Sequence, residues 1–233
     1  MPQQQHLMSV SLRAFLAVLL VGVLMNAASA QSSSDATAQD RTAVDPLIAE
    51  IDEVVEITKR RELDGRQHTP WQILHGVLGM RQDFIIKVDG ERMPALDWIS
   101  KHGATYAGEP YYEATEFGGR GHPFTKPMLF EGHPTQFLAY LTVCKLPLDF
   151  PIKADGNKTI TIQDLVNGAQ KEVKAGDEPA WTLWALTHYL DLDATWENKN
   201  GEAWSIERLL RSQVYENVNT AACGGTHGLF ALA

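Results

Sequence analysis

Apolar residues recur at helical spacing in short segments of the chain, and several of these segments begin just after a proline. One predicted helix carries four such side chains on a single face: Trp71, Leu74, Val77 and Leu78. A second, with looser spacing, carries Trp181, Trp184, Leu186 and Tyr189. Proline is favoured at the first helical position because its missing N–H group would lack a helical partner there anyway. Three pairs therefore predict helix starts: Thr69-Pro70, His133-Pro134 and Glu178-Pro179.

Each of these helices is predicted to lead through a turn into a second helix. Asp-Gly and Asn-Gly pairs favour turns because both residues tolerate positive φ angles. They occur at Asp89-Gly90, Asp155-Gly156 and Asn200-Gly201, and residues 84–88 before the first pair predict a short strand. The closing helices are predicted over 94–102, 161–174 and 203–217, and an earlier helix over 46–63 with Asp45 as its cap.

An internal repeat supports this organisation. Residues 83–90 recur as residues 149–156, with six of eight positions identical at an offset of 66. The same offset relates three flanking pairs: Trp71 to Phe137, Leu96 to Ile162 and Ile99 to Leu165. A third, weaker copy turns at Asn200-Gly201. Because one helical hairpin cannot bury its apolar face alone, such units must stack on their neighbours.

The expected fold is therefore mainly α, with repeated helical hairpins that form an incomplete α/α toroid or short solenoid and small β-like turns at the Asp-Gly and Asn-Gly pairs. The repeat domain is predicted over 45–233, in units of about 64–132, 133–177 and 178–217, with a truncated fourth from 218. Residues 227–233 predict one more opening helix without a partner. This stub predicts either a longer repeat array or self-association of the chain.

The three tryptophan-bearing hairpins and the stretch Asn217–Phe230 resemble the α/α-toroid superfamily. That superfamily includes terpenoid-cyclase and prenyltransferase-like repeats and several polysaccharide lyases. The resemblance covers about residues 64–233. It implies a helical-hairpin fold, and it implies polymer binding or polysaccharide cleavage as candidate functions.

The first 30 residues have the pattern of a secretory signal peptide. Arg13 precedes an apolar run over 14–25, and Ala28-Ser29-Ala30 supplies the small residues that signal peptidase requires. Spanning a bilayer takes about 20 apolar residues, so the run favours a cleaved signal over the alternative, an uncleaved anchor. Residues 31–44 contain little to bury and predict a disordered lead-in. We therefore expect a mature chain from Gln31, periplasmic or secreted, without membrane attachment.

Composition and charge narrow the function classes further. Hydrophobic residues make up 44% and charged residues 21% of 233 positions, as in globular proteins. The formal net charge is −9 and no stripe of Lys and Arg interrupts it, so nucleic acid is not expected as a partner. The sequence contains no Walker loop, Rossmann fingerprint, G-x-S-x-G elbow or EF-hand loop, and no cofactor is predicted.

Three histidines stand at predicted helix starts: His68, His133 and His227. In the third unit the matching position is Glu178 or Pro179. If successive helix starts gather on one face, these imidazoles could bind a metal ion or act as acid and base near neutral pH. No His-x-x-x-His or His-Glu-x-x-His spacing supports a metal, so none is assigned and helix capping is the plainer interpretation.

Two further histidines follow a tryptophan at i, i+4 spacing, His75 after Trp71 and His188 after Trp184. Such pairs share one helix face, and packing is the favoured interpretation. The candidate ligand-binding residues are His68, His133, Trp71 and Trp184.

The segment 103–131 interrupts the first unit and is rich in aromatic, charged and glycine residues. A long irregular loop inside a compact domain is usually functional. Aromatic rings stack on sugar faces, and a Tyr with a nearby His or Arg is what β-elimination at a uronic acid would use. The candidate catalytic residues are Tyr111, Tyr112, Arg120, His122 and His227. The alternative is an ordered loop whose aromatic side chains, Phe124 among them, close the end of the helical stack.

The two cysteines are too few for a disulfide scaffold or a four-cysteine zinc site. In an oxidising compartment, Cys144 and Cys223 can pair as a disulfide. Two buried free thiols, or a reactive Cys223 at a helix start, are the alternatives.

These features lead to two main hypotheses. The first is an exported helical-repeat protein that acts as a binding or scaffold module, with a polysaccharide or other polymer as its partner. The second is a polysaccharide-processing enzyme, a lyase or hydrolase. A terpenoid-cyclase-like activity ranks last because the acidic motif of that group is absent from the sequence.

Overall fold

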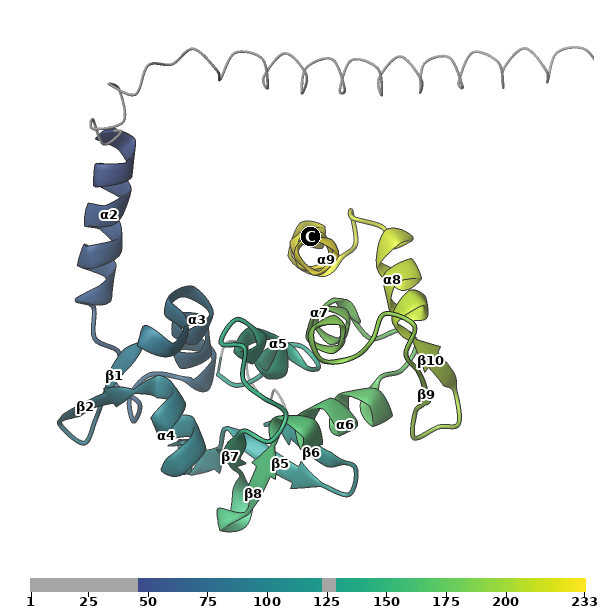
Figure 1. Ribbon diagram of the computed structural model, residues 1–233, viewed down its shortest axis with the longest axis horizontal. Helices are drawn as coiled ribbons and strands as arrows, with labels where there is room; N and C mark the ends of the chain where they lie inside the picture. The colour runs from purple at the N-terminus through teal and green to yellow at the C-terminus, as the bar shows by residue number, and fades with distance from the viewer. Residues whose placement is uncertain (1–45, 123–128) are drawn as a thin grey trace, which may run out of the picture. The chain divides into compact units, whose positions relative to one another are not determined.

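The computed structural model describes residues 46–122 and 129–233, as helices joined by short hairpins (Figure 1). The α-helices are α2 (Pro46–Lys59), α3 (Pro70–Met80), α4 (Ala95–Lys101), α5 (Gln136–Thr142), α6 (Ile162–Glu172), α7 (Ala180–Tyr189), α8 (Ile206–Val214) and α9 (Thr226–Leu232). The strands are β1 (Ile85–Val88), β2 (Glu91–Pro94), β3 (Thr105–Tyr106), β4 (Glu109–Pro110), β5 (Tyr112–Thr115), β6 (Gly118–Gly121), β7 (Pro151–Lys153), β8 (Thr159–Thr161), β9 (Thr195–Glu197) and β10 (Ala203–Ser205).

Two helices begin with reciprocal caps. At the start of α3, the Thr69 side chain accepts a hydrogen bond from the Gln72 N–H group at 3.2 Å, and the Gln72 side chain accepts one from the Thr69 N–H group at 2.9 Å. Thr161 and Asp164 form the same arrangement at the start of α6. These caps satisfy N–H groups that have no partner within the helix. The predicted start of α3 at Pro70 is confirmed.

Antiparallel hairpins make the fold mixed rather than mainly α. Of the described residues, 47% are helical and 18% lie in strands, which form five two-stranded sheets. The predicted mainly-α toroid or solenoid is therefore wrong. The physical reason is that side chains alternate on both sides of each turn, so the flanking residues pair as strands. In β1, for example, Ile86 and Val88 are buried and Lys87 between them is exposed.

A helix–hairpin–helix unit recurs three times, as α3–β1–β2–α4, α5–β7–β8–α6 and α7–β9–β10–α8. In each unit the first N–H group of the closing helix donates a hydrogen bond to the carbonyl group before the hairpin: Ala95 to Phe84 at 2.9 Å, Ile162 to Phe150 at 3.2 Å, and Ile206 to Ala194 at 3.3 Å. Phe84 and Phe150 therefore hold equivalent positions. After the turn the register shifts by one, because Ile162 matches Ala95 and not the predicted Leu96.

A difference between the turns explains this shift. β1 and β2 are joined by Asp89 and Gly90, whose φ angles of 52° and 92° suit a two-residue hairpin turn. β7 and β8 are joined by the longer loop 154–158. In that loop the Asp155 carboxylate accepts a hydrogen bond from the Ala114 N–H group at 2.6 Å, so the turn is fastened to β5.

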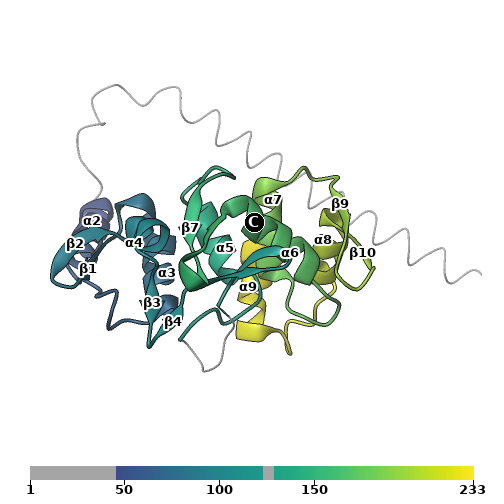
Figure 2. The ribbon, with the colours of Figure 1, turned by 90° about the horizontal axis from the view of Figure 1, so that it is seen from below.

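Within residues 59–233, the opening helices of the repeats form one row. α3 contacts α5, α5 contacts α7, and α7 contacts α9, in the order that Figure 1 shows. The closing helices α4, α6 and α8 lie on the side of this row where the repeat hairpins are. In the turned view of Figure 2, the three repeats follow one another in chain order. Neighbouring opening helices therefore come from neighbouring repeats.

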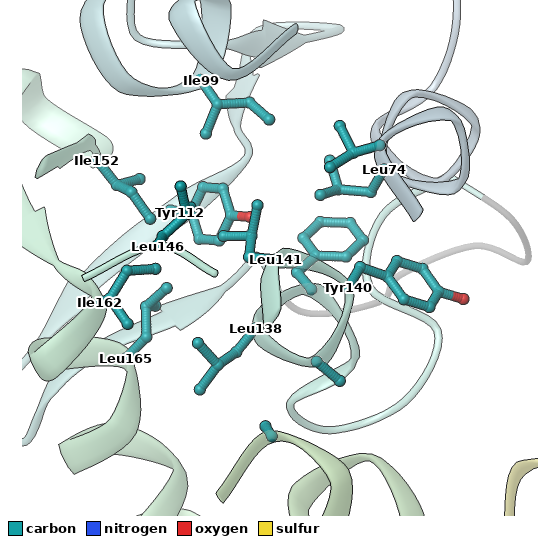
Figure 3. Packing of buried hydrophobic residues seen from close by; sticks show 14 of the residues in the cluster. Leu74, Ile99, Tyr112, Leu138, Tyr140, Leu141, Leu146, Ile152, Ile162 and Leu165 are labelled. Atoms are coloured by element: carbon teal, nitrogen blue, oxygen red, sulfur yellow. The ribbon is translucent and has the colours of Figure 1, made fainter. Parts of the chain in front are cut away.

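The core of this unit surrounds α5, all of whose residues are buried. Figure 3 shows side chains converging there from many elements: Leu74 of α3, Ile99 of α4, Tyr112 of β5, Leu138 and Leu141 of α5, Ile152 of β7, and Ile162 and Leu165 of α6. Burial of this apolar surface supplies the main driving force for folding.

The segment 103–131, predicted as a loop, contains two hairpins in its described part, β3 with β4 and β5 with β6. β6 lies so close to α6 that a Cβ atom on Gly168 would be 2.0 Å from the carbonyl oxygen of Gly119. Glycine is needed there for close backbone contact. Residues 123–128, and with them Phe124, lie outside the described residues.

α2 is described by itself because, apart from Lys59, it belongs to a different compact unit from residues 59–233. It ends at Lys59, earlier than the predicted residue 63, and several of its apolar side chains are exposed: Leu47, Ile48, Ile51 and Val54. The predicted signal peptide, the lead-in 31–44 and the Asp45 cap lie outside the described residues. Among the helices that the structure describes, none is long and apolar enough to span a bilayer.

Candidate functional site

Three side chains from the starts of successive opening helices meet at one point. His133 lies just before α5, Glu178 just before α7, and His227 in the first turn of α9. The Glu178 carboxylate lies between the imidazoles, with Oε2 at 2.5 Å from His133 Nδ1 and Oε1 at 2.5 Å from His227 Nδ1. The two imidazole rings are 4.7 Å apart at an interplanar angle of 75°. All three side chains are half-buried.

The two imidazoles keep the Glu178 carboxylate ionised. Burial raises the pKa of this carboxyl group, but the hydrogen bonds from His133 and His227 outweigh burial and leave the pKa below its ordinary value. Since a carboxylate oxygen only accepts hydrogen bonds, each Nδ1 atom carries the hydrogen in this arrangement. The cluster thus combines one negative charge with two nitrogen donors.

The predicted gathering of helix-start histidines holds for His133 and His227 but not for His68. His68 lies in a turn before α3, where its Nδ1 atom accepts a hydrogen bond from the Asp64 N–H group at 2.8 Å. The prolines explain the difference, because the residue before Pro70 is Thr69, whereas His133 and Glu178 directly precede theirs. Aligning the repeats on these prolines would have identified Glu178 as the third member and excluded His68.

A row of aromatic side chains connects this cluster to α3. Neighbouring ring centroids are 3.7 Å apart for Trp71 and His75, 4.9 Å for His75 and Tyr140, 5.2 Å for Tyr140 and Trp181, and 4.7 Å for Trp181 and His227. Trp184 extends the row, at 5.6 Å from Trp181 and 4.6 Å from Phe230. We call Trp71, His75, Tyr140, Trp181, Trp184 and Phe230 the aromatic row. All six lie on opening helices.

Hydrogen bonds fix the middle of the aromatic row. His75 Nδ1 donates to the Trp71 carbonyl oxygen at 2.6 Å, and the Tyr140 hydroxyl donates to His75 Nε2 at 3.0 Å. The same hydroxyl accepts a hydrogen bond from Gln136 Nε2 at 2.9 Å. Burial lowers the pKa of His75, so this ring is neutral at neutral pH. The predicted packing of His75 on Trp71 is confirmed.

The corresponding prediction, that His188 packs on Trp184, is wrong. His188 is exposed, and the ring contact that the described residues give it is with Tyr189, at 4.8 Å, rather than with Trp184. Trp184 instead stacks within the aromatic row.

A cavity of about 200 Å³ lies beside the His133–Glu178–His227 cluster. Its wall includes His133 and Glu178, together with four more ionisable side chains: Arg120, Glu131, Glu172 and Asp177. Burial raises the pKa of Glu131 to about 8, so this carboxyl group is neutral at pH 7. Among the described residues of the wall, the acidic side chains Glu172, Asp177 and Glu178 outnumber the one guanidinium, so this part of the cavity wall is acidic.

Arg120 and His122 are held by Glu113. Arg120 Nη2 is 2.8 Å from Glu113 Oε2, and Arg120 Nη1 is 3.7 Å from Glu172 Oε1. His122 Nδ1 is 2.9 Å from Glu113 Oε1, at an angle that does not form a hydrogen bond, and its ring packs on Phe130. The charge of Arg120 is therefore already neutralised within the protein.

Tyr111 and Tyr112 are core residues. Both are 0% exposed, and their hydroxyl groups have no hydrogen-bond partner among the described residues. Burial raises the pKa of both phenols well above the ordinary value. A phenol sealed in the core cannot contact a polymer, so the structure gives no support to the predicted catalytic role of these two residues.

The predicted disulfide is absent, because both cysteines are free. Cys144 is buried, and burial raises the pKa of its thiol to about 11. Cys223 is exposed, in the 3-10 turn Ala222–Gly225 that precedes α9. The two thiols thus lie in different environments, and the alternative of two buried thiols does not hold for Cys223.

No protein-family model, curated protein or solved structure matches this chain. The function is therefore inferred from the geometry of the cluster, the cavity and the aromatic row.

Proposed function

We propose that the protein is an exported binding protein whose aromatic row holds a neutral polysaccharide. The observation that carries this proposal is the ring-to-ring contact that runs from Trp71 on α3 to Phe230 on α9 across four opening helices. Trp71 and Trp184 are half-buried and Phe230 is 59% exposed, so solvent reaches the row. Tyr140 and Trp181 are buried and support the row from within. Trp71, Trp184 and Phe230 reach solvent, where each can stack on one sugar face. Export rests on the signal pattern of residues 1–30.

Charge favours a neutral polymer over an acidic one. The formal net charge is −9, and the cavity wall beside the row carries Glu172 and Asp177. Among the described residues that line the cavity, Arg120 is the one Lys or Arg side chain, and it already pairs with Glu113 and Glu172. A polyuronate would bring further negative charge to this surface, where the described residues of the cavity wall offer no unpaired Lys or Arg to meet it.

Affinity electrophoresis in gels that contain β-glucan, xylan or pectate tests the proposal. We expect at least one neutral polymer to retard the wild-type protein, and pectate not to. Trp184→Ala should lose that retardation, because it removes the ring that links Trp181 to Phe230. Trp196→Ala is the matched control, since Trp196 is a half-buried tryptophan of the β9–β10 hairpin, outside the aromatic row. Retardation that survives the loss of both Trp71 and Trp184 would contradict the proposal.

A polysaccharide-processing enzyme is the second candidate. The observation in its favour is the imidazole–carboxylate cluster at the end of the row, which offers groups for acid and base chemistry. A lyase acting on pectate would release unsaturated products that absorb in the ultraviolet. Growth of that absorbance with wild-type protein, and its loss in His133→Ala, would favour the enzyme over the binding protein.

A further inference from the structure

We propose that His133, Glu178 and His227 bind one divalent transition-metal ion of the zinc class, with at least one coordination position open. Among the described residues they are the one group of three or more His, Cys, Asp or Glu side chains whose potential ligand atoms lie close enough together, within 4.8 Å of one another. This inference is independent of polysaccharide binding by the aromatic row.

The donor set indicates the kind of ion. Two imidazoles and one carboxylate, with a water molecule or substrate as a further ligand, form the open type of zinc site. The same three donors also suit iron(II), so geometry and metal supply decide between first-row metals. The group contains no thiolate, which distinguishes it from the closed sites that zinc uses for structure.

The distances fit an ion after small side-chain movements. Metal–ligand distances of about 2.0–2.2 Å place the ligands of a tetrahedral ion roughly 3.3–3.6 Å apart. The two Nδ1–Oε contacts of 2.5 Å would have to lengthen by about 1 Å to reach that separation. Rotation about the side-chain bonds of Glu178 and of the two histidines would have to supply this change.

The surroundings hold the three ligands in place. Pro134 and Pro179 follow His133 and Glu178 directly, and proline fixes the backbone beside each ligand. The Trp181 ring lies 6.0 Å from the His133 ring and 4.7 Å from the His227 ring, so one side chain packs against both imidazoles. Groups that orient metal ligands in this way raise affinity because less freedom is lost on binding.

The charges around the cluster both oppose and favour the binding of a cation. The starts of helices carry a partial positive charge, which disfavours a cation. The Glu178 carboxylate, with Glu172 and Asp177 in the adjacent cavity wall, supplies negative charge that offsets it. His133 and Glu178 line that cavity, so an open coordination position can face it.

Without an ion, the Glu178 carboxylate accepts a hydrogen bond from His227 Nδ1–H and lies 2.5 Å from His133 Nδ1. In the metal-bound state each coordinating Nδ1 atom gives its lone pair to the ion, so its hydrogen moves to Nε2 or leaves to solvent. Calorimetric titration of metal-stripped protein, purified without a polyhistidine tag, with ZnCl2 separates the two states. We expect a saturable heat of binding at one ion per chain. Binding of CoCl2 should give the visible absorption of a four- or five-coordinate ion.

Variants identify the ligands. His133→Asn, Glu178→Gln and His227→Asn should each weaken zinc binding by tenfold or more, a loss typical even of partners behind the ligands. His188→Asn is the matched control, because His188 is an exposed histidine of α7 outside the cluster, and it should bind zinc like the wild type. If a variant fails to fold, the zinc stoichiometry and the cobalt spectrum of the wild type decide alone. Wild-type affinity in the three variants, or neither zinc heat nor a cobalt spectrum in the wild type, would overturn the proposal.

Discussion

His75 shows at the residue scale how the aromatic row sets a protonation state. Its Nδ1–H group donates to a carbonyl oxygen, which only accepts, and its Nε2 atom accepts from the Tyr140 hydroxyl. Both contacts are compatible with a neutral ring. Burial lowers the pKa of His75, and this effect outweighs the hydrogen bond to the Trp71 carbonyl, which raises it. The folded protein therefore resists a proton that the unfolded chain accepts near its ordinary pKa of about 6.5.

This difference predicts a pH-dependent stability. A lowered folded-state pKa of a histidine means that the unfolded state binds more protons on acidification, so the free energy of unfolding falls as the pH drops below about 6.5. His75→Gln removes this titration, and its free energy of unfolding should fall less than that of the wild type between about pH 7.5 and about pH 5. Urea unfolding at the two pH values measures this, with His188→Gln as the exposed control. Equal falls in wild type and His75→Gln would show that His75 is not the responsible group.

The roles of single residues could be predicted from the sequence where interactions within one helix determine them. The Thr69-Pro70 cap and the Trp71–His75 contact follow from spacing within one helix. Tyr111 and Tyr112 do not, because aromatic residues in a glycine-rich segment look alike whether they face a ligand or the core. Their burial depends on β5 pairing with β6 and packing on distant helices, which no local pattern reveals.

At the scale of secondary-structure elements, the close backbone contact of β6 with α6 gives a direct test of the fold. Gly168→Ala would place a methyl group 2.0 Å from the Gly119 carbonyl oxygen, a backbone atom that cannot rotate away. We expect a loss of stability on the order of 1–3 kcal/mol. Gly79→Ala is the matched helical control, because nothing lies within 4 Å of its Cβ position, and it should stabilise by about 0.5–1 kcal/mol through helix propensity. Chemical denaturation of both variants checks this; if Gly168→Ala proves as stable as Gly79→Ala, the described contact is not present.

Phe84 and Phe150 hold equivalent positions in two repeats but differ in burial, so their replacement by alanine should reduce stability to different extents. Phe84 is 8% exposed, and its ring covers Gly76, whose Cβ position would be 2.2 Å from ring atoms. Phe150, at the equivalent place, is only half-buried. Phe84→Ala should cost about 3–5 kcal/mol of stability and Phe150→Ala at least about 1 kcal/mol less, because cost follows buried area. Thermal and urea unfolding would contradict this ranking if Phe150→Ala were the more damaging change.

The repeat itself was predictable because the residues of each turn and cap are local signals. The strands were not, apart from β1, because pieces of two to four residues carry too little alternation to identify. The closing helix predicted from Ala203 begins at Ile206 for this reason, since Ala203–Ser205 pair with β9.

At the scale of the whole molecule, the order of the repeats creates the candidate site. Each opening helix packs on the next, so residues that precede equivalent helix starts become neighbours although 45 or more positions separate them in the chain. The sequence indicates a common face for the helix starts but not which side chains meet there, because that depends on the exact helix start in each repeat. In α9 the side chains of Leu229 and Phe230 are exposed, with 66% and 59% of their surface accessible to solvent. Self-association of the chain through this helix stays a prediction, which sedimentation equilibrium can test.

The convergence of His133, Glu178 and His227 is the central claim, and a crystal grown with zinc tests it most directly. Diffraction data collected on both sides of the zinc absorption edge locate the ion without reference to any prior structure. We predict one strong anomalous peak per chain between His133 Nδ1, His227 Nδ1 and the Glu178 carboxylate, at about 2.0–2.2 Å from each ligand atom. A density map in which these three side chains lie apart, or in which zinc occupies other residues and leaves the cluster empty, would contradict the account.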